Sequence, residues 1–259
     1  MERRTALFIY LTAGYPDLET TRDLIPALVA AGADAVEIGV PFSDPLADGA
    51  TIQESTLHAL KQNVNLQDCL DIVKDLRNQI PNTPLILMGY YNPLFNYGLE
   101  EFCREASTNG VDGLIVPDLP ADESQPLLNH CQTSGIDLIP LLSPNSTDKR
   151  IEFVCSKARG FIYCVTVTGI TGTRDSFPED LGIFIKRVRA HSDLPLGLGF
   201  GISTREHMKK IGQIADAGIV GSALVKILQS YSKIERKQKA IEFVKELRGS
   251  ANDLCEEEY

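Results

Sequence analysis

Short apolar segments rich in β-branched residues alternate along the whole chain with segments whose apolar residues have helical spacing. Leu66, Leu70 and Val73, for example, recur at intervals that place them on one face of a helix. Strands that alternate with helices predict a parallel sheet with right-handed crossovers. Eight such units within 259 residues favour a closed (β/α)₈ TIM barrel over an open sheet. The apolar segments are residues 7–11, 35–39, 85–88, 113–116, 137–141, 161–165, 196–199 and 218–220.

Three of the joints between a predicted helix and the next strand repeat a glycine followed two residues later by an aspartate. The pairs are Gly32 with Asp34, Gly110 with Asp112, and Gly135 with Asp137. Glycine is common just after a helix because it adopts a left-handed conformation without a steric clash. These joints belong to the N-terminal face of the barrel, so we predict a structural role for them. No low-complexity linker divides the chain: residues 1–249 are predicted to form a single barrel, and residues 250–259 a polar, acidic and disordered tail.

Composition excludes several classes of function. The net charge of −10 leaves no basic stripe for nucleic acid, and no apolar run approaches the length of a membrane span. The segment after Met1 lacks the features of a signal peptide, so we expect a cytoplasmic protein. The six cysteines are scattered without metal-ligand spacing, which predicts free thiols and no metal site.

In a barrel of this kind, chemistry is expected on the loops that follow the strands. In the strand over residues 35–39, Val36 and Ile38 suit the helix-facing side, which turns Glu37 toward the barrel interior. A buried carboxylate is costly unless it is solvated, paired or used in catalysis. The structural alternative is a Glu37 held by a lysine or arginine, but the sequence offers no obvious inward-facing cation.

Two further features follow predicted strands and are ambiguous by themselves. Asp44 and Asp48 lie in the loop after the second strand, where they also suit ordinary turns. Glycine-rich segments at residues 168–173, 199–203 and 221–223 suit a phosphate, because backbone N–H groups and a helix N-terminus bind anions without lysine. Glycine-rich turns are common, however, and Ser222 also suits a helix N-cap.

Residues 37–49, EIGVPFSDPLADG, resemble the signature of the tryptophan synthase alpha chain family. The resemblance implies retro-aldol cleavage of indole-3-glycerol phosphate to indole and glyceraldehyde 3-phosphate by a carbon–carbon lyase. It implies that Glu37 is the acid–base residue and that Asp48 binds the indole N–H, with Asp44 as loop architecture.

The resemblance extends over almost the whole chain and implies further site residues. The implied phosphate ligands are Gly172, Gly201, Gly221 and Ser222. The implied walls of the indole pocket are Tyr10, Met88, Ile115, Leu141, Tyr163 and Phe200, and Thr171 resembles a loop residue that contacts the acid–base loop. Each wall residue also suits an ordinary barrel core.

The family works as an α₂β₂ heterotetramer in which indole passes to a beta chain that carries pyridoxal phosphate. Residues 90–98 and 117–120 resemble partner-facing loops, and their aromatic residues and prolines are typical of interfaces. No lysine lies in a pyridoxal-binding context, so no cofactor is expected in this chain. The first strand begins soon after Met1, so a helix that closes the barrel bottom is predicted to be missing or minimal.

Two other functions fit parts of the pattern. One is a catalytically weak subunit that only activates a beta chain, and the presence of Glu37, Asp48 and the glycine segments argues against it. The other is a different phosphate-binding barrel, such as an isomerase or synthase of the same pathway, which typically uses a lysine or an Asp/Cys pair at strand ends. Neither is prominent in this sequence.

Overall fold

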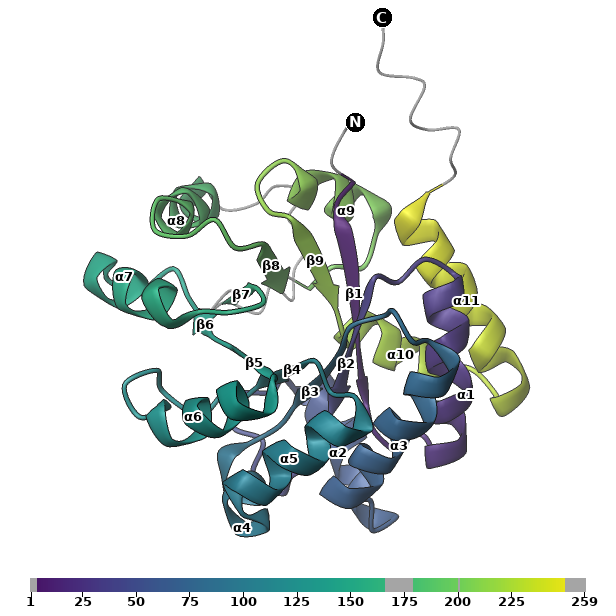
Figure 1. Ribbon diagram of the computed structural model, residues 1–259. Coiled ribbons are helices and arrows are strands. Elements are labelled where there is room, and N and C mark those ends of the chain that lie inside the picture. Colours follow the sequence, from purple (N-terminus) through teal and green to yellow (C-terminus); the bar gives the residue numbers. More distant parts are fainter. Residues whose placement is uncertain (1–3, 166–178, 200, 250–259) are drawn as a thin grey trace, which may run out of the picture.

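The computed structural model describes residues 4–165, 179–199 and 201–249, and its strands form one parallel sheet surrounded by helices (Figure 1). The strands are β1 (Ala6–Thr12), β2 (Ala35–Gly39), β3 (Leu85–Met88), β4 (Gly113–Ile115), β5 (Asp137–Ile139), β6 (Leu141–Leu142), β7 (Ile162–Val165), β8 (Leu196–Gly199) and β9 (Ala217–Val220). The helices are α1 (Leu18–Ala30), α2 (Ala50–Lys61), α3 (Leu66–Gln79), α4 (Tyr91–Tyr97), α5 (Leu99–Asn109), α6 (Gln125–Ser134), α7 (Asp148–Lys157), α8 (Glu179–Arg189), α9 (Arg205–Gly212), α10 (Ser222–Ser230) and α11 (Lys233–Arg248). The predicted tail, residues 250–259, lies outside the described residues.

The strands follow the order β5-β4-β3-β2-β1-β9-β8-β7-β6, and every pairing is parallel. The two ends of this order, β5 and β6, are consecutive in the chain and are separated only by Pro140. Proline has no N–H to donate, although its carbonyl accepts a hydrogen bond from the Tyr163 N–H at 3.0 Å. The strand predicted over residues 137–141 is thus divided into β5 and β6, which together occupy one strand position of the barrel. The predicted (β/α)₈ barrel is confirmed.

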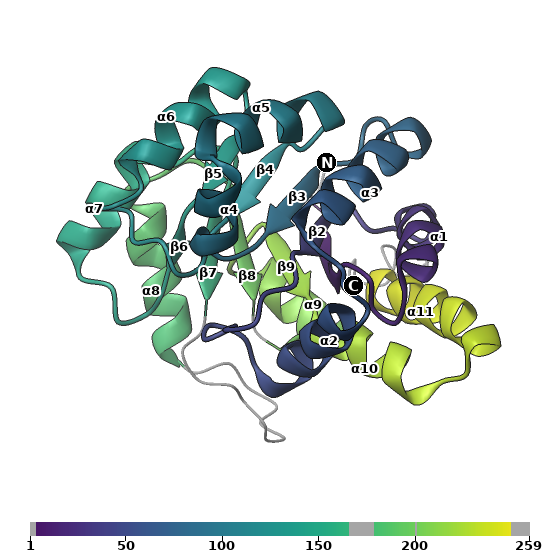
Figure 2. The ribbon, with the colours of Figure 1, turned by 90° about the horizontal axis from the view of Figure 1, so that it is seen from below.

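Side chains on the two faces of the strands form two separate cores. The inner core packs Ala35, Ile86, Ile115, Ile139, Phe161 and Ile219 inside the barrel. Val36 and Ile38 belong to the larger core between strands and helices, as the alternation of β2 predicts. Seen from below, α6, α7 and α8 lie on one side of the strands and α1, α10 and α11 on the other (Figure 2).

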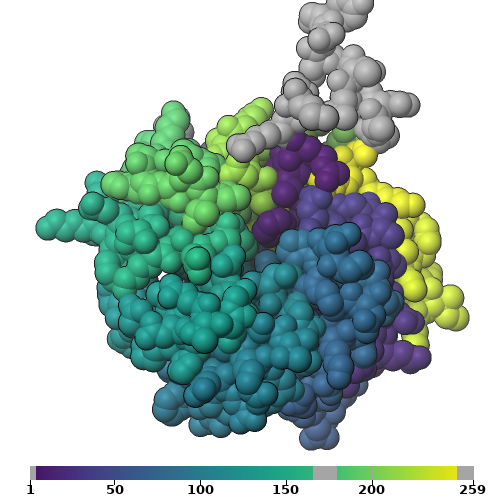
Figure 3. Space-filling view, in the orientation of Figure 1, coloured from purple at the N-terminus to yellow at the C-terminus, as the bar shows by residue number. Residues whose placement is uncertain are grey.

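In the space-filling view, the colours follow one another round the visible face in sequence order, from purple through blue and teal to green (Figure 3). None of the helices in the described part of the chain is long and apolar enough to cross a membrane.

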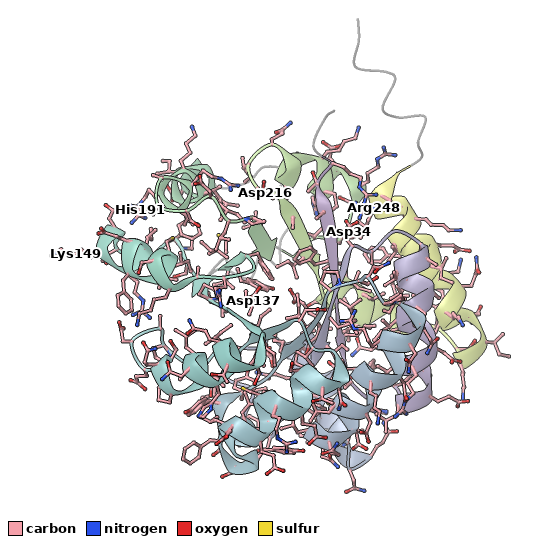
Figure 4. The ribbon with its side chains drawn as sticks, viewed as in Figure 1. Asp34, Asp137, Lys149, His191, Asp216 and Arg248 are labelled. Carbon is pink, nitrogen blue, oxygen red and sulfur yellow. The ribbon has the colours of Figure 1, made fainter. Side chains whose placement is uncertain are left out.

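The joints at the N-terminal face have the predicted structural role. Gly110 and Gly135 end their helices in the left-handed conformation, at φ 94° and 73°. The Asp34 carboxylate accepts a hydrogen bond from the Leu7 N–H at 2.8 Å and pairs with Arg248, which lies beside it in Figure 4. These contacts tie α11 and β2 to β1 at the face opposite the predicted site.

Candidate active site

Glu37 lies in the middle of β2, next to Tyr10 on β1 and Ile86 on β3. Its side chain is 0% exposed, and neither carboxylate oxygen has a hydrogen-bond partner among the described residues. Burial raises the pKa of Glu37 to about 8, because the ionised form loses its hydration without gaining a partner. The structural alternative, a lysine or arginine paired with Glu37, is absent from the part of the chain that the structure describes.

Asp48 lies in the loop between β2 and α2, where its backbone forms a turn and its side chain faces Tyr90. Its backbone N–H donates to the Pro45 carbonyl at 3.0 Å, as a turn residue does. Its Oδ2 accepts a hydrogen bond from the Tyr90 hydroxyl at 3.1 Å. Burial raises the pKa of Asp48 to about 6, and the bond from Tyr90 opposes this rise. Asp48 is therefore a partly desolvated carboxylate rather than only a turn residue.

The two carboxylates share one region at the C-terminal end of the barrel. Burial raises the pKa of Tyr163, and the negative charges of Glu37 and Asp48 raise it further. The same two charges raise the pKa of Tyr10, after burial itself. Tyr10 is in register with Glu37 on the neighbouring strand, so it lies beside this carboxylate. The structure thus brings together two acids whose environments set their pKa values apart.

The structure describes five of the residues that the sequence predicts as pocket walls, and all five are buried or partly buried. Tyr10 and Ile115 are buried, while Met88, Leu141 and Tyr163 are partly buried in the barrel interior. Phe200 and Thr171 lie outside the described residues.

Two of the predicted phosphate ligands lie at the start of α10. Gly221 is the residue before the helix, and Ser222 is its exposed first residue. No side chain caps this helix, so Ser222 is not the N-cap that the sequence offered as an alternative. Gly201 has φ +60°, with no atom within 4 Å of the place a Cβ would take. Gly172 lies outside the described residues.

The Tyr10 side chain explains why the two positions next to it, 39 and 221, are glycines. A Cβ on Gly39 would lie 2.1 Å from the Tyr10 hydroxyl, and one on Gly221 would lie 3.3 Å from the Tyr10 ring. Glycine at these positions makes room for the tyrosine beside Glu37.

The sequence pattern did not predict a buried chain of hydroxyl groups that begins at Tyr10, beside Glu37. The Tyr10 hydroxyl lies 3.3 Å from Thr12 Oγ1, which lies 2.6 Å from Ser55 Oγ. Ser55 in turn donates to the Ile52 carbonyl at 2.8 Å. The chain joins β1 to α2, the helix that follows the Asp48 loop, and only the polar residues at the end of β1 hinted at it.

The segment predicted as a partner-facing loop at residues 90–98 differs from that prediction. Residues 91–97 form α4, and within the segment Tyr90 and Leu94 are buried, at 4% and 1% exposure. Phe95 is 62% exposed, so one face of the helix does present an aromatic side chain to solvent. Burial of Leu94 against the core explains why this short segment is helical.

A separate cavity of about 300 Å³ lies between α6, α7 and the strands β4 to β6. Its lining includes Leu128, Arg150 and Val154. Among the predicted site residues that the structure describes, only Leu141 borders it, and neither Glu37 nor Asp48 lines it, so it is distinct from the carboxylate site.

The fold, with two carboxylates of raised pKa on β2 and in the loop that follows it, is that of a (β/α)₈-barrel enzyme. The sequence model described as "Tryptophan synthase alpha chain" matches residues 1–255. The chain belongs to the tryptophan synthase alpha chain family. This confirms the family predicted from residues 37–49 and, with it, a carbon–carbon lyase that acts on indole-3-glycerol phosphate.

Individual relatives cover nearly the whole chain. The tryptophan synthase alpha chain of Dehalococcoides mccartyi is 45% identical over 249 residues, which are 96% of each protein. That of Roseiflexus sp. is 46% identical over 246 residues, covering 95% of this chain and 94% of the relative. A crystal structure of the tryptophan synthase complex from Pyrococcus furiosus has a TM-score of 0.88 and 36% identity, covering 96% of this chain and 100% of its own. That structure is of a complex, which agrees with the prediction that this chain works with a partner chain.

Proposed function

We propose that Glu37 and Asp48 together cleave indole-3-glycerol phosphate to indole and glyceraldehyde 3-phosphate in this chain. The observation that carries the proposal is the Glu37 carboxylate, which is fully buried in β2 without a hydrogen-bond partner among the described residues, while Asp48 lies in the loop that follows the same strand. A folded protein retains such a group at a cost of stability, which favours a catalytic use.

Glu37 supplies both proton transfers of the retro-aldol step. With a pKa of about 8 it is protonated at neutral pH and donates its proton to C3 of the indole ring. The resulting carboxylate then removes the proton of the side-chain hydroxyl next to C3. The electrons of the breaking carbon–carbon bond return to the ring, so indole and the aldehyde leave with no net change in protons on Glu37.

Asp48 stabilises the intermediate between these transfers. Protonation at C3 places positive charge on the ring nitrogen, and a carboxylate that accepts the N–H hydrogen bond lowers the energy of that state. A pKa of about 6 leaves most of Asp48 ionised at neutral pH. Its role therefore needs a charge, whereas the role of Glu37 needs a proton.

The phosphate binds where backbone N–H groups are free. The first turn of α10, after Gly221, leaves N–H groups without helical partners and has the positive end of the helix dipole. Gly201 and the Ser222 hydroxyl are the further ligands that we propose from the described residues, and Gly172, which lies outside them, is proposed from the family resemblance alone. This arrangement accounts for anion binding by a protein with a net charge of −10.

The deciding experiment measures indole release from indole-3-glycerol phosphate by the purified chain, with and without a beta chain. We expect release in both conditions and faster release with the partner. Release in neither condition overturns the proposal and leaves a subunit that only activates its partner.

The pH dependence of kcat/KM is a sharper test of the two roles. We expect a bell-shaped profile with an acid limb near pH 6, where Asp48 gains a proton, and a basic limb near pH 8, where Glu37 loses one. The substrate phosphate also titrates near pH 6, so inhibition by glycerol 3-phosphate over the same range serves as the control. A rate that keeps rising above pH 9 contradicts the assignment of Glu37 as the proton donor.

Ser222→Ala tests the phosphate site. A hydrogen bond to a charged group contributes about 1.5–3 kcal/mol, so we expect KM to rise about tenfold or more with little change in kcat. Ser230→Ala, at the other end of α10, is the matched control, because within the described structure the Ser230 hydroxyl bonds only to the Lys226 carbonyl. Equal KM values for the two variants and the parent chain remove Ser222 from the site.

For the assembly, we propose an α₂β₂ heterotetramer in which the released indole passes to a beta chain that holds the pyridoxal phosphate. Support comes from the family membership and from the complex among the similar structures. The exposed Phe95 on α4 and the turn at residues 117–120 are the predicted contacts. A cytoplasmic location stays a prediction from the sequence.

A further inference from the structure

Tyr90 lies between the barrel and the Asp48 loop. It follows the end of β3 and is the residue directly before α4, and it is 4% exposed. Its ring packs against that of Phe42, from the Asp48 loop, with centroids 5.3 Å apart. This packing brings the phenol hydroxyl to the loop that carries Asp48.

The direction of the Tyr90 hydroxyl is set by its two partners. The Ala47 N–H donates to the Tyr90 oxygen at 3.0 Å. Because a backbone N–H can only donate, the Tyr90 oxygen is the acceptor in this bond. The single phenol proton is therefore left for Asp48 Oδ2, 3.1 Å away. Asp48 Oδ1 has no hydrogen-bond partner among the described residues, so it is the oxygen left for a ligand.

The backbone that holds Tyr90 is anchored independently of the Asp48 loop. The Tyr91 N–H donates to both carboxylate oxygens of Asp118, at 2.9 and 3.2 Å. The Gly89 N–H donates to the Ile115 carbonyl at 3.0 Å. Both acceptors lie at the end of β4 or just after it, so β4 holds the backbone on either side of Tyr90. The Tyr90 hydroxyl then reaches the loop that follows β2, the strand on the other side of β3.

From this geometry we infer that Tyr90 is a positioning residue for Asp48, which keeps that carboxylate ionised and directs Oδ1 toward the indole N–H. A hydrogen bond donated to a carboxylate favours its charged form and opposes the effect of burial. Without this bond, Asp48 holds its proton to higher pH and rotates more freely. The inference rests on the proposed role of Asp48, and it adds the residue that prepares Asp48 for that role.

Tyr90→Phe tests the inference, because phenylalanine keeps the ring packed on Phe42 and removes only the hydroxyl. We expect the acid limb of the kcat/KM profile to move up by about one pH unit, which alone lowers kcat/KM at pH 7 about twofold. Freer rotation of Asp48 should bring the total fall in kcat/KM at pH 7 to about tenfold. The inhibition constant of glycerol 3-phosphate should not change, because the phosphate site is elsewhere. Tyr97→Phe, measured without a partner chain, is the matched control: this α4 tyrosine also donates to a carboxylate, that of Glu105 at 2.5 Å, and its loss should leave the profile unchanged.

A readout that does not need activity separates this inference from the proposed function. The carboxyl carbon of Asp48 is followed by ¹³C NMR across pH, with its signal assigned by its absence in Asp48→Asn. Titration at higher pH in Tyr90→Phe supports the inference even in a chain that releases no indole. Titration at the same pH in both proteins, together with an unmoved acid limb, overturns it and leaves the proposed function standing.

Discussion

Glu37→Gln is expected to lower kcat for indole release by about 10³-fold, within the range of about 10²–10⁴ for general acid–base groups. Glutamine has nearly the shape of a protonated glutamic acid but neither donates a proton to carbon nor removes one from a hydroxyl. Because Glu37 has no hydrogen-bond partner in the described structure, the substitution breaks no existing contact. The loss should therefore fall on kcat and leave substrate binding nearly unchanged.

Single-turnover measurements with indole-3-glycerol phosphate separate chemistry from binding in this variant. Asp44→Asn is the matched control, because Asp44 is an exposed carboxylate in the loop that follows the same strand. Turnover within a few-fold of the parent chain in Glu37→Gln refutes the acid–base role.

The same variant carries a second, thermodynamic signature. The folded-state pKa of Glu37, about 8, lies above its ordinary value of 4.5, so the folded state holds this proton over a range where the unfolded state has lost it. The free energy of unfolding should therefore fall as pH rises from about 4.5 to about 8. Glutamine removes this dependence, so Glu37→Gln should gain stability relative to the parent chain at pH 9. Chemical denaturation at pH 5 and pH 9 measures the difference.

Strand alternation was enough to predict the environment of Glu37. Once Val36 and Ile38 are assigned to the helix-facing side, the period of two leaves Glu37 inside, and the structure places it there. The break at Pro140 was also open to prediction, since proline cannot donate within a central strand, but the apolar run conceals it.

The environment of Asp48 was beyond reach of the sequence pattern. Its hydrogen-bond partner, Tyr90, lies forty-two residues away on the next strand end, and local spacing carries no information on contacts between strands. The sequence predicted a loop with exposed aromatic residues at 90–98, because its three tyrosines, one proline and one phenylalanine lack a clear helical pattern. Burial of Leu94 and Tyr90 stabilises the helix in this segment. Such packing is a tertiary effect, so local helix propensity does not predict it.

Asp48→Asn is expected to lower kcat/KM by about 10²–10³-fold, as is typical when one group that stabilises transition-state charge is removed. An amide oxygen can in principle accept the indole N–H, which would make the change mild. The Tyr90 hydroxyl prevents this, because its proton already points at the Oδ2 position and attracts the amide oxygen there. The NH₂ group then occupies the Oδ1 position and opposes the indole N–H, donor against donor.

This orientation makes a prediction about the double variant. If Tyr90 turns the amide the wrong way, adding Tyr90→Phe to Asp48→Asn frees the amide to flip and restores an acceptor to the substrate. The double variant should then be at least as active as Asp48→Asn alone, although Tyr90→Phe by itself lowers kcat/KM about tenfold. Indole release is measured at one pH for the parent chain, the two single variants and the double variant, which together form a double-mutant cycle. A double variant with the product of the two single losses would show that Tyr90 and Asp48 act independently, because the amide orientation would then play no part in the loss.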